Sequence, residues 1–251
     1  MLAITPGATI NTKGAYVQMT AACPADICAL TVGIFFNPQT AAETLVSMDI
    51  AVGGAGSEAI VIPDIVVDAS AQFGLTLFNT IFPIQIPKGT RIAARSQANA
   101  ASATNYILLT ANSFDGGFAY EGYARYDSIG VSGTPILGTN VTPSATANTK
   151  GSYAQLIAST ARDYSGFVLS VDTRGIAGAN TYAVDVAVGG AGSEVVVMTN
   201  HSVNTGTTGA KAQNTPFIGV PIPAGTRVSA RCASNVGSDT HTIGAALYGA
   251  Y

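Results

Sequence analysis

The segments with the most obvious potential for chemistry are two glycine-rich runs. They read Gly53-Gly54-Ala55-Gly56-Ser57-Glu58 and Gly189-Gly190-Ala191-Gly192-Ser193-Glu194. A glycine-rich loop binds phosphate where it opens a helix, because the N-terminal amides of that helix hold the anion. The first run leads instead into residues 59–63, a strand-like sequence that contains a proline, and the Lys-Ser/Thr pair of a Walker motif is absent. We therefore predict tight turns between strands, in which glycine supplies backbone angles that other residues avoid. The turn glycines are Gly53, Gly54, Gly56, Gly189, Gly190 and Gly192.

Acidic and basic residues recur around these turns and suggest ion pairs. Asp49 and Glu58 flank the first turn, and Arg91 and Arg95 follow four residues apart, a spacing that places both on one face of a strand. Buried arginines need carboxylate partners, so we expect an Asp/Glu–Arg network in each half of the chain. The arginines could alternatively bind a glycan or a phosphate. The ion-pair candidates are Asp49, Glu58, Arg91, Arg95, Asp185, Glu194, Arg227 and Arg231.

Pairs of carboxylates could also hydrolyse glycosides, which requires two acids about 5–10 Å apart. Asp115 with Glu121, or Asp49 with Glu58, would be the candidates. We interpret all four as solvated or ion-paired acids, because nothing else in the sequence points to a sugar-cleaving site.

Nucleophilic and metal sites are not indicated either. Both histidines, His201 and His241, lie in the second half, and the Gly-x-Ser-x-Gly elbow is absent. The three cysteines are Cys23, Cys28 and Cys232, and with two histidines they make no tetrahedral zinc set. Cys23 and Cys28 could close a small loop. We therefore predict that the protein is not an enzyme and has no catalytic residue, metal or cofactor.

An internal repeat indicates how the chain is organised. Residues 5–16 return as 142–153, residues 49–58 as 185–194 and residues 87–95 as 223–231, in the same order and at nearly the same offset. A period above about 100 residues indicates two whole domains rather than solenoid units. We predict a duplication with repeats at 1–115 and 141–251, joined by a Gly/Ser/Tyr-rich connector at 116–140.

Short β-type segments bounded by Gly, Pro, Asn or Asp fill each repeat. In the first repeat we predict strands at 16–21, 29–36, 44–52, 59–67, 73–78, 83–86, 91–97 and 106–111. No long stretch has helical periodicity with caps at both ends. About eight short strands in about 110 residues fit a β-sandwich, most naturally a jelly roll. The predicted fold class is all-β, with two tandem jelly-roll-like sandwiches.

The composition favours a protein that packs into an assembly. Charged residues are only 10% of the 251 residues, against about 25% in an ordinary soluble domain, and 28 residues are glycine. A surface of small, weakly hydrated side chains suits a subunit of a larger structure. The 11 Lys and Arg residues are scattered and the net charge is −3, so we expect neither nucleic acid nor membrane as a partner. The N-terminal residues do not resemble a signal peptide, and we expect synthesis in a reducing cytoplasm.

The repeated sequences Asp-Ile/Val-Ala-Val-Gly-Gly-Ala-Gly-Ser-Glu and Pro-Lys/Ala-Gly-Thr-Arg-Ile/Val-Ala/Ser-Ala-Arg resemble virion structural proteins of tailed bacteriophages. The similarity spans both repeats. It implies a capsid decoration (cement) protein or a tail-associated component located in the virion, with a major capsid protein or another virion protein as partner. The resemblance also implies a homo-oligomer, most often a trimer at a capsid symmetry axis.

Two further expectations concern contacts with other molecules. Tyrosine gives contact area at a low entropic cost, so Tyr120, Tyr123 and Tyr126 in the connector are interface candidates for a neighbouring molecule, together with the N-terminal segment. The alternative function is a tail or fibre protein whose loops recognise host glycans. The absence of tryptophan weighs against it, because sugar sites often stack on that ring.

Overall fold

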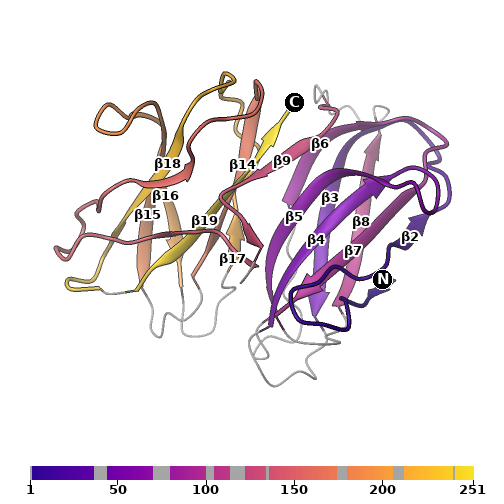
Figure 1. Ribbon diagram of the computed structural model, residues 1–251, viewed down its shortest axis with the longest axis horizontal. Helices are drawn as coiled ribbons and strands as arrows, with labels where there is room; N and C mark the ends of the chain where they lie inside the picture. The colour runs from indigo at the N-terminus through magenta and orange to yellow at the C-terminus, as the bar shows by residue number, and fades with distance from the viewer. Residues whose placement is uncertain are drawn as a thin grey trace.

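The computed structural model describes residues 2–36, 44–69, 80–99, 105–113, 122–133, 136–173, 180–205, 212–239 and 241–251. The described residues form β-strands and no helix, so the all-β prediction is confirmed (Figure 1). Seventeen of these strands belong to four antiparallel sheets, which pack as two sandwiches. Consequently none of the described residues belongs to a helix that could cross a membrane.

The first sandwich contains eight strands of the N-terminal half. Its strands are β1 (Leu2–Ile4), β2 (Val17–Thr20), β3 (Ile27–Phe36), β4 (Thr44–Val52), β5 (Ala59–Ala69), β6 (Thr80–Ile86), β7 (Ile92–Ala98) and β8 (Asn105–Ser113). One sheet has the order β1-β8-β3-β6 and the other β2-β7-β4-β5. This is the strand order of an eight-stranded jelly roll.

The second sandwich repeats this order with the strands of the C-terminal half. Its strands are β12 (Thr139–Val141), β13 (Ala154–Ile157), β14 (Gly166–Asp172), β15 (Thr181–Val188), β16 (Val195–Asn204), β17 (Ala212–Asn214), β18 (Val228–Ser234) and β19 (Ile243–Ala250). The sheets run β12-β19-β14-β17 and β13-β18-β15-β16. The two halves thus have one topology, as expected if the sequence repeat reflects a duplication.

The segment predicted as a connector contributes strands of its own. It contains β9 (Tyr126–Ile129), β10 (Ser132–Gly133) and β11 (Ile136–Leu137), of which the last two pair only with each other. β9 pairs antiparallel with β19 and so becomes a fifth strand of that sheet. In Figure 1 it crosses from the first sandwich to the second.

Seven of the eight strands predicted for the first repeat coincide with observed strands to within a few residues. The eighth, 73–78, lies outside the described residues. Sequence analysis missed β1, because three residues at the start of the chain are too short to show an alternating pattern. In central strands such as β18 and β19, burial is nearly continuous rather than alternating, because both faces of these strands are covered.

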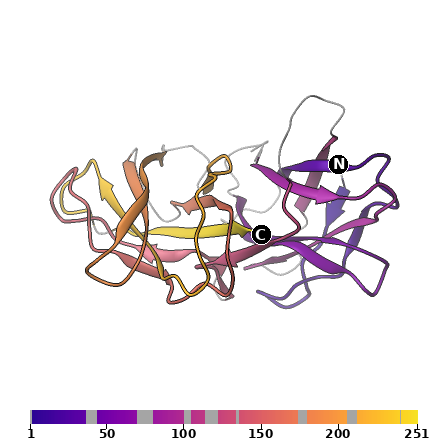
Figure 2. The ribbon, with the colours of Figure 1, turned by 90° about the horizontal axis from the view of Figure 1, so that it is seen from above.

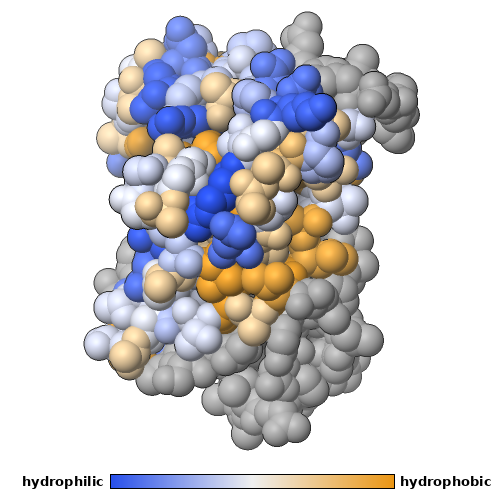
Figure 3. Space-filling view, turned by 90° about the vertical axis from the view of Figure 1, so that its right-hand side faces the viewer, coloured by the Kyte–Doolittle hydropathy of each residue, from blue (hydrophilic) through white to orange (hydrophobic). Residues whose placement is uncertain are grey.

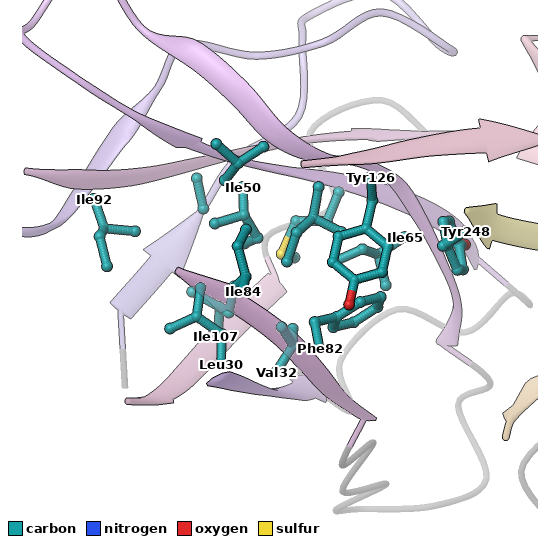
Figure 4. Close-up of a cluster of buried hydrophobic side chains, with 14 of the residues drawn as sticks. Leu30, Val32, Ile50, Ile65, Phe82, Ile84, Ile92, Ile107, Tyr126 and Tyr248 are labelled. Carbon is teal, nitrogen blue, oxygen red and sulfur yellow. The ribbon is translucent and has the colours of Figure 1, made fainter. Parts of the chain in front are cut away.

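Two hydrophobic cores fill the sandwiches, and the first extends across the boundary between them. Besides residues of the first eight strands, it includes Tyr126, Val168, Tyr248 and Ala250 from β9, β14 and β19. Figure 4 shows the Tyr126 ring directed at Phe82, with Tyr248 beside them. The second core lies within the second sandwich and β9. The molecule is therefore one elongated body in which the two sandwiches lie side by side along its long axis (Figure 2).

Candidate functional site

A buried carboxylate on β4 forms the centre of an ion-pair network in the first sandwich. Asp49 is 2% exposed. Its carboxylate accepts hydrogen bonds from Lys13 Nζ and Arg95 Nε, each at 2.8 Å, and from the backbone amide of Asp64 at 3.0 Å. Burial opposes ionisation of Asp49, but the Lys13 charge and these hydrogen bonds outweigh it and lower the pKa of the carboxyl group.

The second sandwich repeats the arrangement around Asp185, which is also 2% exposed. Lys150 Nζ lies 2.6 Å and Arg231 Nε 2.9 Å from its carboxylate, and the amide of Asn200 donates at 2.9 Å. Burial again opposes ionisation and the same three kinds of donor lower the pKa. Each network ties three strands of one sheet, because the aspartate, the arginine and the amide lie on adjacent strands.

An aromatic ring completes each network. Arg95 Cζ lies 4.6 Å from the centre of the Tyr16 ring, and Arg231 Cζ lies 4.6 Å from that of Tyr153. A guanidinium over a ring gains a cation–π attraction while its Nε holds the carboxylate. Both arginines therefore have partners within their own sandwich.

The glycine turns also bind a carboxylate of the same chain. The amide of Gly56 donates to Glu58 Oε2 at 2.9 Å, and Arg91 donates to Glu58 Oε1 and to the carbonyl of Gly53, both at 3.0 Å. The backbone φ angles are +108° at Gly53 and +82° at Gly56. The Gly56 amide that a phosphate would use is thus occupied by Glu58. The hydrogen bond from its own amide, together with those from Arg91 and Gly56, lowers the pKa of Glu58.

The second turn has matching geometry. The amide of Gly192 donates to Glu194 at 2.9 Å, and Arg227 donates to Glu194 at 3.0 Å and to the carbonyl of Gly189 at 3.2 Å. In both turns the carbonyl of the second glycine, Gly54 or Gly190, accepts a hydrogen bond at 3.0 Å from the amide of the serine three residues later. All eight predicted ion-pair residues are therefore engaged in two pairs of equivalent clusters.

One connector tyrosine, Tyr126, lies inside the molecule rather than on a surface for a neighbour, which corrects our expectation for that residue, while Tyr123 is half-buried. Tyr126 is 2% exposed, its hydroxyl donates to the carbonyl of Pro83 at 2.8 Å, and its ring meets Phe82 edge-on at 5.2 Å. Tyr123 lies against the Phe217 ring at 5.1 Å. An aromatic side chain between two sandwiches has apolar surface on both sides, so it joins them. Tyr120 lies outside the described residues, as do Asp115 and Glu121.

The three cysteines lie in the interior of the molecule. Cys23, Cys28 and Cys232 are buried thiols, so Cys23 and Cys28 do not close a loop. Burial raises the pKa of Cys23, and that of Cys232 to about 12. In the described part of the chain, no group of three or more His, Cys, Asp or Glu side chains is placed to hold a metal ion.

No model of a protein family matches this sequence, and neither does any curated protein.

Sequence analysis missed four residues with central positions. Lys13 and Lys150 lie in the repeated Asn-Thr-Lys-Gly sequence, so the repeat itself was a usable signal for them. The carboxylate of Asp64 accepts hydrogen bonds from Lys13 Nζ at 2.8 Å and from the hydroxyl of Ser128 on β9 at 3.2 Å. Asp239 accepts hydrogen bonds from the hydroxyl of Tyr182 and from other groups near it. The last two have no acidic counterpart in the repeat, which is why the pattern did not reveal them.

Proposed function

We propose that the protein is a non-enzymatic structural component of a virus particle, a capsid decoration (cement) protein on the head of a tailed bacteriophage. The observation that carries the proposal is the shared core at the junction, where Tyr126 and Tyr248 join two jelly rolls into one elongated body. Such a body presents a long folded surface. This is what a protein needs in order to bind across the boundary between capsid subunits.

The charged residues and the composition support the same proposal. The acids and arginines of the two repeats make internal ion pairs, which stabilise the sandwiches and leave few charges outside. A low-charge surface loses little solvation free energy when it is covered by neighbours. The partners we propose are other copies of the chain, with a homotrimer favoured, and the major capsid protein.

The test is to locate the chain in purified virus particles whose genome encodes it. Immunogold labelling with antibodies to the recombinant protein should mark the head. Quantitative mass spectrometry should find it in many copies, in a fixed ratio to the major capsid protein. Particles made without the gene should release DNA at a lower temperature than complete particles, and added recombinant protein should restore the higher temperature. Absence from particles, or a few copies confined to the tail, would contradict the proposal.

A pocket in the second sandwich favours one alternative, a tail or fibre protein that recognises host glycans. It has a volume of about 570 Å³, and its lining includes Asn140, Thr142, Ser144, Ser152 and Tyr153. Hydroxyl and amide groups beside an aromatic ring are suited to sugars, which present hydroxyls and an apolar face.

A glycan array separates this alternative from a purely structural role. A glycan-binding protein should retain a defined set of sugars, and Tyr153→Ala should abolish retention while Tyr16→Ala, at the equivalent position of the first sandwich, should not. Equal loss in both variants, or no retention by the wild-type protein, would remove the alternative.

A further inference from the structure

One edge is complete in the second sandwich and incomplete in the first. In the second sandwich, β12 pairs with residues 243–245 of β19 and β9 with residues 247–250, so the side of β19 away from β14 is covered along its length. In the first sandwich, β1 pairs with residues 105–107 of β8. Among the described residues no strand pairs with Leu108–Ser113 on that side.

The uncovered part of β8 presents hydrogen-bonding groups outward. Tyr251, which follows β19, exchanges both backbone hydrogen bonds with Arg125 next to β9. Because alternate residues of a strand point their amides to the same side, Gly249 and Leu247 also face β9. The registers with β1 and β12 make Ile107 equivalent to Ala245, so Ala111 and Leu109 are the corresponding residues of β8. Their amide and carbonyl groups face the uncovered side.

An apolar pocket lies beside this edge. It has a volume of about 160 Å³ and is lined by Met19, Cys23, Ile27, Leu30 and Leu109, among others. A cavity of about 150 Å³ is large enough to bind benzene, so this pocket has room for one aliphatic side chain. The same end of the molecule carries an apolar area in the space-filling view (Figure 3).

In the second sandwich, a side chain from β9 occupies the equivalent place. Ile129 is 2% exposed and lies opposite Leu247 in the β9–β19 register. It belongs to the core cluster that also contains Leu156, Tyr164 and Phe167, the equivalents of Met19, Ile27 and Leu30. The second sandwich therefore shows what covers this edge: an extended antiparallel segment with an aliphatic residue opposite the strand leucine.

We propose that β8 binds an extended segment of a different protein. The segment runs antiparallel along Leu108–Ser113, exchanges backbone hydrogen bonds with Leu109 and Ala111, and inserts an aliphatic side chain into the pocket. This mode of binding adds a strand to a sheet edge, with affinity from the backbone and specificity from the pocket. It does not depend on the proposed virion function.

A second copy of this chain fits the edge less well. Two β8 edges could pair antiparallel about a two-fold axis, since identical strands are self-complementary in that arrangement. When the pairing involves only described residues of β8, the registers that keep one edge clear of β1 of the other copy place Ala111 or Ser113 opposite Leu109. Neither side chain is large enough to fill the pocket, so the geometry favours a different polypeptide.

The residues at the mouth of the pocket determine the type of a second side chain in the bound segment, the one opposite Ala111. In the second sandwich, Asp127 of β9 lies opposite Gly249 and pairs with Arg162 Nε at 2.9 Å, while the Tyr164 hydroxyl donates to it at 2.9 Å. The equivalents of Arg162 and Tyr164 in the first sandwich are Ala25 and Ile27. The residue opposite Ala111 is therefore apolar, and the bound segment has apolar residues at two alternate positions.

The experiment uses peptides derived from the β9 sequence. The probe is Ala-Arg-Tyr-Val-Ser-Ile-Gly, segment 124–130 with Asp127→Val, carrying a fluorescent label. The matched control peptide has serine in place of the isoleucine. The probe should bind the full-length protein in an anisotropy titration, and the control should bind at least about tenfold more weakly, because burying one aliphatic side chain contributes that much affinity. Hydrogen exchange should slow at the amides of Leu109 and Ala111 when the probe is added.

Two variants establish where the probe binds. Ala111→Pro removes an outward amide without removing a bond to β3, and proline is tolerated at such edge positions. Ala111→Trp places a ring at the pocket mouth from an exposed position and keeps the backbone intact. Each should reduce probe binding at least about tenfold. Circular dichroism and the melting temperature report whether each variant is folded, and the tryptophan variant decides if the proline variant is not.

Three results would overturn the proposal. The first is equal binding of probe and control peptide, or binding of neither up to the solubility limit. The second is unchanged probe binding by a folded Ala111→Trp variant. The third is a dimer in solution in which the amides of Leu109 and Ala111 are already protected without peptide, because the occupant would then be a second copy.

Discussion

Tyr248 on β19 and Thr110 on β8 occupy equivalent positions in the two sandwiches, yet they have opposite surroundings. Tyr248 is fully buried, its hydroxyl donates to the carbonyl of Asp64 at 2.9 Å and accepts the amide of Val66 at 2.7 Å. Thr110 is exposed. The outer face of the sheet is therefore an internal contact in one sandwich and a free surface in the other.

The strands β5 and β16 show the same contrast from the other side of the junction. Ile62 and Ile65 of β5 are buried, whereas Met198 and His201, at the equivalent positions of β16, are only half-buried. Asp64 contacts Ser128 of β9, while Asn200 at the equivalent position is exposed. Positions that are alike in the two halves maintain the sandwich, and positions that differ create the contact between the halves.

The largest expected effect comes from removing the aromatic side chain at the junction. Tyr248→Ala leaves a cavity and two backbone groups without partners, so we expect it to lower the free energy of unfolding by about 3–5 kcal/mol. Thr110→Ala, the matched control, should change it by less than about 0.5 kcal/mol. Urea unfolding followed by circular dichroism measures both. Similar effects of the two substitutions would show that the junction contributes little to stability.

A somewhat smaller effect is expected where β9 completes the second core. Ile129→Ala should lower the free energy of unfolding by about 2–4 kcal/mol, because it opens in the second sandwich the pocket that the first already has. Ser128→Ala on the same strand, whose hydroxyl makes one long hydrogen bond to Asp64, should cost about 1 kcal/mol or less. Hydrogen exchange of β19 should rise in the isoleucine variant alone. If it does not, β9 does not stabilise that edge.

The architecture could be predicted from the sequence because its causes are local and repeated. Gly53 and Glu58 recur at the same spacing as Gly189 and Glu194, and such turns between β-type segments indicate a sandwich. The short strand β1 could not be predicted, since its pairing with β8 depends on residues about 100 positions away. The ion pairs involving Asp49 and Arg95 were suggested by their joint recurrence.

The junction could not be predicted, because it uses connector residues that have no counterpart in the other half and repeat positions at which the two halves differ. Tyr126, Ser128 and Ile129 read in the sequence as a polar, tyrosine-rich connector. Their side chains face the interior because β9 pairs with β19, and this pairing is a tertiary interaction. A repeat identifies what two halves share, whereas the residues that join them lie outside it or at positions where the halves differ.

The two Lys–Asp–Arg networks allow a comparison with a moderate expected effect. Asp185→Asn leaves Lys150 without a carboxylate, and we expect a loss of about 2–3 kcal/mol in the free energy of unfolding. Asp49→Asn should lower the free energy of unfolding by about 1–2 kcal/mol, because Lys13 still forms an ion pair with Asp64 at 2.8 Å. Adding Asp64→Asn to the Asp49 variant should bring its loss to that of the Asp185 variant. Equal losses in the two single variants would mean that Asp64 does not compensate.

The smallest effect is a pH dependence that distinguishes the junction from the rest of the molecule. Burial raises the pKa of Tyr126 and of Tyr248 well above the ordinary value. In the unfolded chain both ionise near pH 10, while in the folded chain they keep their protons, so ionisation favours the unfolded state at high pH. Their contribution to stability is complete below about pH 10 and declines above it, by at most about 1.4 kcal/mol per pH unit for each tyrosine.

Unfolding by urea between pH 8 and about 11 measures the slope. Tyr248→Phe should be less stable at pH 8, because it lacks the hydroxyl, yet lose less with rising pH. A variant slope as steep as that of the wild-type protein would place the alkaline sensitivity elsewhere, for example at Tyr182, whose pKa burial and Asp239 raise to about 12.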